Sequence, residues 1–256
     1  MGHHSRGNRT TGTGPAAVEH YRNAALPGAQ LSSPHQQAIL SDLLQHALGD
    51  TTVDVALDLG CGQGSNFRQL ASRAERVVAA DVSASALDDA RSTHRELDGR
   101  IETVLLSGGP LPFDDGVFPL ALCTEVLEHV DDLEATAAEL ERVTKQGGYI
   151  VVSTPNYRNV MGLIKRYKDR RSGRNDFDPW HAHAGGFERL VTAPQILGVF
   201  RQCELLEERG ADYAFALGIM WSPLRWRLSR YLLLTPGRHR RLARFGMQYS
   251  MLLRRK

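Results

Sequence analysis

Blocks of apolar residues alternate with amphipathic stretches along the chain and predict a regular succession of strands and helices. Short apolar runs typical of buried strands occupy residues 53–59, 76–80, 101–106, 117–123, 149–154 and 204–213. Apolar residues at three- and four-residue spacing predict intervening helices at 65–74, 84–95, 132–145 and 193–201. Alternation of this kind is typical of an α/β protein with a doubly wound parallel sheet.

Local signals mark where several helices begin and end. Ser33-Pro34 predicts the start of a further helix, in which apolar residues recur at helical spacing. Thr192 and Gln195 have the spacing of a capping box. The pair Gly147-Gly148 is expected to end the third of the intervening helices before the next strand begins.

The two ends of the chain differ from its α/β centre. Residues 1–17 are rich in Gly, Thr and Arg and predict a disordered lead, whereas residues 18–50 predict a helical cap beside the sheet. The α/β domain then spans 51–256. Apolar residues at helical spacing within 216–246 predict an inserted helical lid, and the alternation at 247–254 predicts one more strand.

Composition and charge narrow the class of protein. The chain has 256 residues, 42% of them hydrophobic, and three cysteines whose number and spacing suit neither a disulfide framework nor a zinc site. We therefore expect a soluble cytoplasmic protein. The formal net charge is only +2, but residues 213–256 contain ten Lys and Arg and no acid, so the remainder is acidic.

The densest local signal is the stretch from Val55 to Ser65, an apolar run that ends in Asp58 and continues into three alternating glycines. A buried strand is expected to stop there and a helix to begin. Because glycine has no Cβ, Gly60, Gly62 and Gly64 are free to adopt positive φ and to let a ligand approach the backbone. The loop is therefore predicted to cradle a cofactor.

The residues around this loop indicate which cofactor it holds. A dinucleotide-binding loop requires a glycine where Ser65 stands, and no lysine follows to pair with a phosphate. The next predicted strand ends in Asp81, about twenty residues after the first glycine, where an acid accepts hydrogen bonds from ribose hydroxyls. These features favour a ligand with a ribose and without a phosphate.

Several ordered motifs resemble those of class I S-adenosylmethionine-dependent methyltransferases, over about residues 53–210. They are Asp58 to Gly64, Asp81, Leu111-Pro112-Phe113 and Glu125 to Val130. Together with Ser153 to Asn156, the last motif is similar to the small-molecule branch that includes the ubiquinone-biosynthesis O-methyltransferases. The resemblance implies a Rossmann-like sheet of seven strands, mostly parallel, with an antiparallel last strand and a helical lid insertion.

The resemblance also implies S-adenosyl-L-methionine as the cofactor. The residues expected to bind it are Asp58, Gly60, Cys61, Gly62, Gly64, Asp81, Val82, Ser107, Gly108 and Glu125. Asp58 is expected to orient the loop and the cofactor amine, although a carboxylate serving only the local turn is an alternative. Asp81 can alternatively be an acid favoured by a helix N-terminus. Ser107 stands where the family usually has an acid for the adenine amine.

His129 and Glu125 are the candidate catalytic residues. Glu125 is expected near the cofactor, and His129 where a general base would meet an acceptor hydroxyl. In the enzymes that this motif resembles, matching residues hold a divalent metal, which here implies Glu125, Glu128 and His129. The plainer interpretation is that Glu128 and His129 form a solvated first turn of a helix.

Other candidates concern the acceptor and partners. His181 and His183 lie in the loop where the family builds its acceptor pocket, and Tyr21 and Trp221 are candidates to line it; polar loop residues and packing aromatics are the plainer interpretations. The basic segment 225–244 is either a solvated lid exterior, a peripheral membrane contact or a site for an acidic substrate. Nucleic acid is not expected as a partner.

The sequence thus predicts a methyltransferase that acts on a small molecule, most readily at oxygen, with nitrogen and carbon acceptors left open. An NAD-type oxidoreductase is one alternative, disfavoured by Ser65 and by the motifs that follow it. A non-catalytic regulator that binds S-adenosylmethionine is another, because a cofactor cradle does not by itself establish turnover.

Overall fold

The computed structural model describes residues 34–156, 191–211 and 242–256. It also describes shorter pieces at 18, 21–22, 159–160, 162–164, 167, 171, 213 and 227. Several predictions lie outside the described residues, namely the lead at 1–17, most of the insertion at 216–246, His181, His183 and Trp221.

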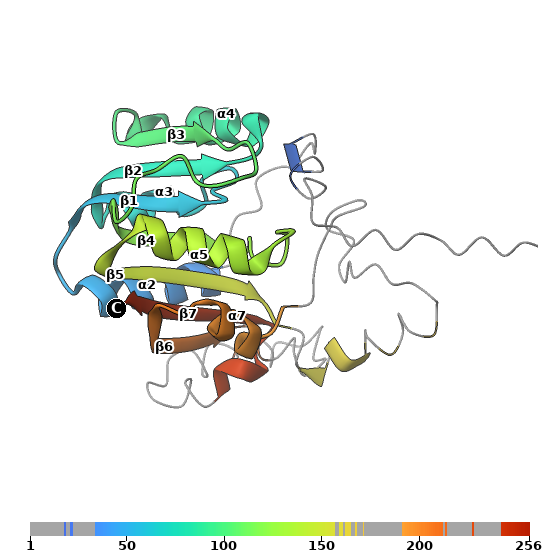
Figure 1. The fold of residues 1–256 in the computed structure, drawn as a ribbon. Helices are drawn as coiled ribbons and strands as arrows, with labels where there is room; N and C mark the ends of the chain where they lie inside the picture. The colour runs from blue at the N-terminus through green and yellow to red at the C-terminus, as the bar shows by residue number, and fades with distance from the viewer. Residues whose placement is uncertain are drawn as a thin grey trace, which may run out of the picture.

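Seven strands form one mixed sheet. They are β1 (Val53–Leu59), β2 (Ala74–Asp81), β3 (Ile101–Leu105), β4 (Phe118–Thr124), β5 (Thr144–Pro155), β6 (Cys203–Ala211) and β7 (Gln248–Arg255). Their order is β3-β2-β1-β4-β5-β7-β6, and β1 to β5 pair in parallel (Figure 1). β7 pairs antiparallel with both β5 and β6. The predicted sheet with its antiparallel last strand is confirmed.

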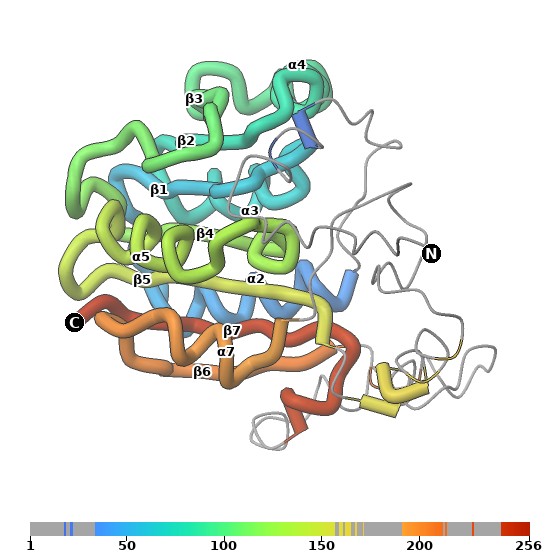
Figure 2. The backbone as a smooth tube through the Cα atoms, turned by 45° about the vertical axis from the view of Figure 1, so that its right-hand side comes forward, coloured from blue at the N-terminus to red at the C-terminus, as the bar shows by residue number. Residues whose placement is uncertain are grey.

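Helices cover both faces of the sheet. They are α2 (Pro34–Leu48), α3 (Phe67–Ala71), α4 (Ala84–Thr93), α5 (Leu133–Val143) and α7 (Ala193–Val199), with the short 3₁₀ turns η1 (Arg95–Leu97) and η2 (Ala243–Phe245). Figures 1 and 2 show α5 and α7 across one face and α2 behind the sheet. The strands supply apolar side chains to both sides, because Leu57 packs in the cluster with α5 and Ala56 in the cluster with α2.

Among the differences between predicted and observed boundaries, two concern the ends of helices beside a strand. The expected helix 132–145 ends at Val143, and β5 begins at once, so that Gly147-Gly148 lie inside the strand and do not end the helix. Gly147 has φ +76°, and a Cβ on Gly148 would lie 2.9 Å from the Pro119 carbonyl oxygen. The two glycines therefore allow an irregular, closely packed stretch in β5, where the register with β4 shifts. The helix expected at 65–74 is also shorter, because β2 already begins at Ala74.

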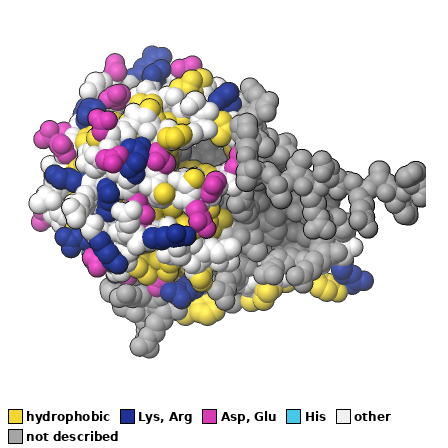
Figure 3. Space-filling model, in the orientation of Figure 1, with side chains coloured by type: hydrophobic (Ala, Val, Ile, Leu, Met, Phe, Trp, Pro, Cys, Tyr) yellow, Lys and Arg dark blue, Asp and Glu magenta, His cyan; other side chains and the backbone are white. Residues whose placement is uncertain are grey.

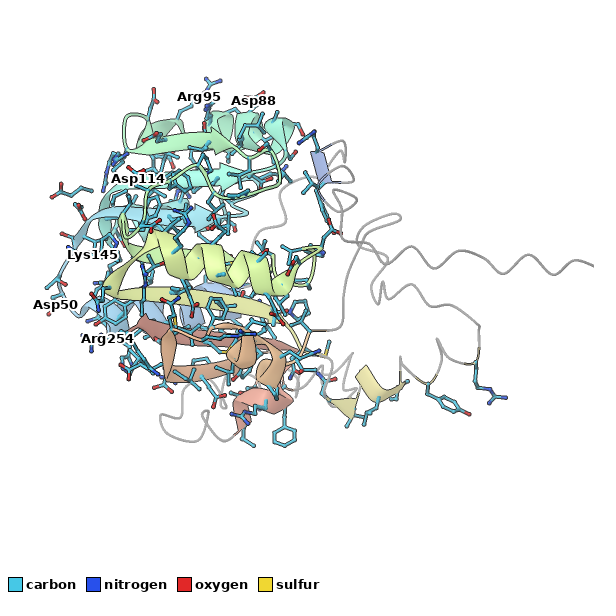
Figure 4. All side chains as sticks on the ribbon, viewed as in Figure 1. Asp50, Asp88, Arg95, Asp114, Lys145 and Arg254 are labelled. Carbon is cyan, nitrogen blue, oxygen red and sulfur yellow. The ribbon has the colours of Figure 1, made fainter. Side chains whose placement is uncertain are left out.

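The parallel strands end at one edge of the sheet, and this edge positions the candidate site. The loops after β1, β2 and β4 leave from it. The last residues of β5 and β6 lie at the same edge, in register with the first residue of β7, because β7 runs antiparallel to both. These residues are Pro155, Ala211 and Gln248. The opposite edge carries exposed charged side chains, among them Asp50 and Lys145 (Figure 4). Ligands of open α/β sheets bind at the carboxyl edge.

Candidate functional site

The three glycines after β1 all have positive φ, but they have different surroundings. Gly60, Gly62 and Gly64 have φ values of +69°, +51° and +82°. A Cβ on Gly60 would lie 2.3 Å from Val126 Cγ2, and one on Gly64 would lie 2.7 Å from the Phe67 ring. A Cβ on Gly62 would meet nothing within 4 Å. Two glycines thus permit close packing, whereas Gly62 presents its backbone to open space.

Asp81 ties the end of β2 to this loop. Its Oδ2 accepts a hydrogen bond from the Gly62 backbone N–H at 2.8 Å, and its Oδ1 accepts one from the Ser83 N–H at 2.9 Å. Burial raises the pKa of Asp81, and these backbone donors offset part of the rise. Each carboxylate oxygen has a second lone pair, so Asp81 retains acceptor capacity toward a ligand.

Asp58 is fully buried at the end of β1, and neither of its carboxylate oxygens has a well-formed hydrogen bond among the described residues. Burial raises the pKa of Asp58 to about 7, and the negative charge of Asp81 adds to the rise, against a smaller opposing effect of the Asn66 amide. The Asn66 amide lies just after the loop, so a role of Asp58 in the local turn stays open beside a role toward the cofactor. A buried carboxylate whose oxygens lack a well-formed hydrogen bond is also typical of a ligand site.

Cys61 and Val82 flank these groups. The Cys61 side chain is buried in an apolar cluster with Phe67 and Ala79, and burial raises the pKa of its thiol. A role in binding would therefore fall to the Cys61 backbone. Val82 directly follows Asp81 and is partly exposed.

A short N-terminal piece lies over the loop after β3. The Arg22 guanidinium donates to the Ser107 backbone oxygen at 3.1 Å. Gly108 has φ +82°, and a Cβ there would lie 2.6 Å from Val18 Cγ2. Ser107 and Gly108, which were expected near an adenine, are thus held beneath Val18 and Arg22.

Glu125 begins the turn after β4 in an unusual backbone conformation. Its φ of +56° is the only positive value of a non-glycine residue among those described. Glu125 Oε1 accepts hydrogen bonds from Ser153 Oγ and Gln248 Nε2, both at 2.8 Å. Burial raises the pKa of Glu125, and the two donors offset part of that rise. Because two other strands hold this carboxylate, the strained conformation is maintained.

Glu128 and His129 follow in the same turn, and α5 begins only at Leu133. The Glu128 side chain is 2% exposed, with its Oε1 3.7 Å from His129 Nε2. The interpretation of a solvated first helical turn is therefore wrong. His129 Nδ1 lies 2.7 Å from the Tyr21 hydroxyl, and the two rings meet edge to face. Tyr21 thus contacts the candidate base directly.

The described residues do not support the metal that the resemblance implies. Across these residues, no three His, Cys, Asp or Glu side chains are arranged to hold a metal ion. Glu125 Oε1 is instead engaged by two hydrogen-bond donors. Glu125, Glu128 and His129 therefore do not fit a metal centre in this structure, and no catalytic step is assigned to one.

Some contacts of the site could not be predicted from the sequence. Val126 joins the glycine loop to the turn after β4 through its approach to Gly60. Gln248 reaches Glu125 across 123 positions of the chain. A predicted final strand is a signal for the location of Gln248, but not for the direction of its side chain.

Comparison with known proteins identifies the domain built around this site. Residues 57–152 match the family model described as "Methyltransferase domain". Together with the sheet order, this match shows that residues 57–152 lie in a methyltransferase domain of the class I fold, a family whose methyl donor is S-adenosylmethionine.

Named relatives match part of the chain. A malonyl-[acyl-carrier protein] O-methyltransferase of Serratia marcescens is 41% identical over 101 residues, which are 38% of this chain and 37% of that protein. A ubiquinone biosynthesis O-methyltransferase of Alkalilimnicola ehrlichii is 31% identical over 116 residues, 45% of this chain and 47% of that protein. The chain thus spans less than half of either relative's length.

A solved structure extends the likeness in fold beyond this part. NodS, an N-methyltransferase from Bradyrhizobium japonicum solved with S-adenosyl-L-homocysteine, has a TM-score of 0.59 to this chain. The alignment covers 94% of this chain and 97% of NodS at 15% identity. At this identity the likeness is one of fold.

Proposed function

We propose that the whole protein transfers a methyl group from S-adenosylmethionine to a small-molecule acceptor, with oxygen as the acceptor atom. The observation that supports this proposal most directly is the open space beside the Gly62 backbone. The Gly62 N–H donates to Asp81 Oδ2 at 2.8 Å, which fixes the loop next to the acid expected to bind the ribose. Oxygen is supported by the names of two relatives, both O-methyltransferases. The names of the same two relatives support a metabolite as the methyl acceptor.

The cofactor would be held by the three loops at the carboxyl edge. When bound, S-adenosylmethionine supplies a methyl group already activated on a sulfonium sulfur. The Gly60–Gly64 loop would contact its aminoacyl part, with the buried Asp58 polarising the loop beneath. Asp81 would accept from the ribose hydroxyls through its remaining lone pairs, and Ser107 with Gly108 would border the adenine.

His129 is the proposed general base. In the tautomer that carries hydrogen on Nδ1, His129 donates to the Tyr21 oxygen, and Nε2 keeps a lone pair for the proton of the acceptor hydroxyl. The Glu128 carboxylate, 3.7 Å from Nε2, would stabilise the imidazolium formed. Tyr21 then acts as a positioning residue that fixes the ring, and Glu125 fixes the turn.

Transfer of tritiated methyl from S-adenosylmethionine to a metabolite and lipid extract tests the proposal. Label in a small molecule supports turnover, whereas cofactor binding without transfer favours a non-catalytic regulator. Binding of NADH in place of S-adenosylhomocysteine would favour an oxidoreductase. Label released by mild base would indicate a methyl ester and argue against a hydroxyl acceptor. Mass spectrometric identification of a base-stable product would distinguish a methyl ether, which supports the proposal, from an N- or C-methyl group, which contradicts oxygen as the acceptor.

The role of His129 is tested in the same assay. His129→Gln should lower turnover by about 10²- to 10⁴-fold with cofactor affinity preserved, because general base catalysis contributes about that much. His46→Gln, on the partly exposed face of α2, is the matched control. Tyr21→Phe should shift the pH profile of turnover; a wild-type rate in His129→Gln would remove His129 from the mechanism.

A further inference from the structure

An exposed apolar stripe follows β5. The described residues from 160 to 171 are helical, yet their large apolar side chains face solvent at the spacing i, i+3, i+4, i+7. These side chains, with their exposed fractions, are Val160 (46%), Leu163 (61%), Ile164 (43%) and Tyr167 (60%). We call these four residues the apolar stripe. A helix of a globular protein normally turns such a stripe toward the core.

Asn159, just before the helical residues, fixes the start of this segment to the sheet. Asn159 is buried, and its Nδ2 donates to the backbone oxygens of Asn156 at 2.6 Å and Gly246 at 3.1 Å. Its Oδ1 accepts from the Gly162 N–H at 2.9 Å. The Asn159 side chain thus holds the first turn against the ends of β5 and η2, with the apolar stripe outward.

The exposed apolar surface continues onto η2. Leu242 and Phe245 are 36% and 58% exposed, and they lie beside Gly246, which accepts from Asn159. In Figure 3, hydrophobic side chains gather along the lower margin of the molecule, where Figure 1 places η2 and the helical residues that follow β5. Exposed apolar groups that gather in this way mark interaction sites.

The chain around the stripe is strongly basic. Residues 157–174 contain seven Lys and Arg and a single acid, Asp169. The Arg171 guanidinium lies 5.6 Å from the centre of the Tyr167 ring and donates to its hydroxyl at 2.9 Å. Basic residues beside an apolar helical face are typical of helices that lie on anionic membrane surfaces.

The stripe also lies at a functional position. It starts five residues after β5 ends at Pro155, at the carboxyl edge from which the loops with Gly62 and Asp81 leave. None of the described helices is long and apolar enough to cross a membrane, so contact through the stripe would be peripheral. A surface contact here would bring the candidate site close to the lipid headgroups.

We propose that the apolar stripe docks the protein on an anionic lipid bilayer. The four side chains enter the interface between headgroups and acyl chains, and the flanking Lys and Arg pair with the headgroups. A bilayer suits these four exposed side chains better than an acidic protein does, because a bilayer needs no groove of matching shape to receive them. The contact differs from the one predicted for residues 225–244, most of which lie outside the described residues. It is independent of the acceptor proposed above.

Cosedimentation with vesicles tests the proposal on the full chain. Vesicles of phosphatidylcholine with about 30 mol% phosphatidylglycerol should bind the protein at least about tenfold more tightly than pure phosphatidylcholine, and binding should weaken as salt rises. The double variant Leu163→Asp, Ile164→Asp should lose at least about tenfold in vesicle affinity. Val117→Asp, an exposed apolar position at the opposite edge of the sheet, should bind as the wild type does.

Two measurements keep the outcomes distinct. Affinity for S-adenosylhomocysteine should be unchanged in the double variant, which shows that the fold and cofactor site are intact. Equal vesicle binding by wild type and double variant would overturn the proposal. So would absence of binding to anionic vesicles, including the case in which the protein instead forms a complex with an acidic protein. None of these results depends on whether methyl transfer is observed.

Discussion

At the scale of single residues, the glycine loop shows how similar positions have different tasks. Gly60, Gly62 and Gly64 form one motif in the sequence and share positive φ. The structure separates them, because Val126 and Phe67 occupy the space beside the outer two and nothing occupies the space beside Gly62. The sequence predicted a backbone open to a ligand, but not which glycine provides it.

Gly60→Ala and Gly62→Ala form a matched pair. Both should cost about 1–2 kcal/mol of stability, because alanine is strained at positive φ. Gly60→Ala should cost about 1–3 kcal/mol more, since its Cβ would overlap Val126. Urea unfolding measures this difference. Gly62→Ala should instead weaken S-adenosylhomocysteine binding in calorimetry by about tenfold or more; normal affinity would show that the ligand does not lie against Gly62.

The stability of the protein should depend on pH through Asp58. Its pKa is about 7 in the folded chain and near 3.8 when unfolded, so between these values the folded state holds the extra proton. The free energy of unfolding should therefore fall as pH rises from 4 to 7. Asp58→Asn removes this pH dependence. Between pH 4 and 7, the free energy of unfolding of the variant should rise relative to that of the wild type by as much as about 4 kcal/mol.

Urea titrations at several pH values measure the effect of Asp58. Asp54→Asn, at an exposed position of the same strand, should follow the wild type. Parallel pH profiles for Asp58→Asn and wild type would mean that Asp58 is ionised in the folded protein. Cofactor affinity should fall in Asp58→Asn. The buried acid would then strengthen cofactor binding while it lowers the stability of the protein without cofactor.

At the scale of elements, the sequence located strands better than turns. β1 begins and ends at the predicted residues, because its mostly apolar stretch follows the polar pair Thr51-Thr52 and stops at the glycine loop. Glu128 and His129, for which a first helical turn was the plainer interpretation, lie in a turn before α5. Glu125 was expected near the cofactor, but its positive φ, held by bonds from β5 and β7, was not predicted. Such long-range bonds leave no periodic signal. For the same reason the partner of His129, Tyr21, could only be named as a candidate.

The segment after β5 should detach when its side-chain anchor is removed. Asn159→Ala removes one donor to the Gly246 carbonyl, which keeps the Asn156 amide as a second donor, and should cost about 0.5–1.5 kcal/mol. The amides of Gly162 and Leu163, which bond to Asn159, should exchange hydrogen faster. Asn159→Asp keeps the acceptor for Gly162 and should preserve more of that protection. Unchanged exchange in Asn159→Ala would show that the anchor lies elsewhere.

At the scale of the whole molecule, the fold followed from the order of elements. Alternating strands and helices imply a parallel sheet, and the alternation at 247–254 indicated a last strand, whose antiparallel direction came from the resemblance. The cofactor loops were predictable because carboxyl ends of parallel strands share an edge. The acceptor pocket was not, since its candidates His181, His183 and Trp221 have no periodic pattern and lie outside the described residues.

Ligand-induced stabilisation of the full chain should distinguish the cofactor. S-adenosylhomocysteine at a hundredfold excess over its dissociation constant should add about 2.7 kcal/mol, or roughly 5–10 °C in thermal midpoint. NADH should give no shift. Asp81→Ala should lose more than half of the shift, because a hydrogen bond to a charged group contributes about 1.5–3 kcal/mol. The control Asp88→Ala lies on the exposed side of α4 and should retain it (Figure 4).

The insertion of β7 between β5 and β6 has a consequence for biogenesis. β6 has no neighbour in the sheet except β7, which follows it in the chain. During translation, the backbone groups of β6 therefore stay unpaired in the sheet until β7 has been synthesised. The same late strand carries Gln248, the donor to Glu125, so the turn that begins at Glu125 is completed only after β7 has been synthesised. A nascent chain that stops before β7 would leave unpaired the backbone groups of β5 and β6 that face β7 in the sheet. Unpaired strand edges are prone to aggregation, so such a chain would be expected to bind chaperones.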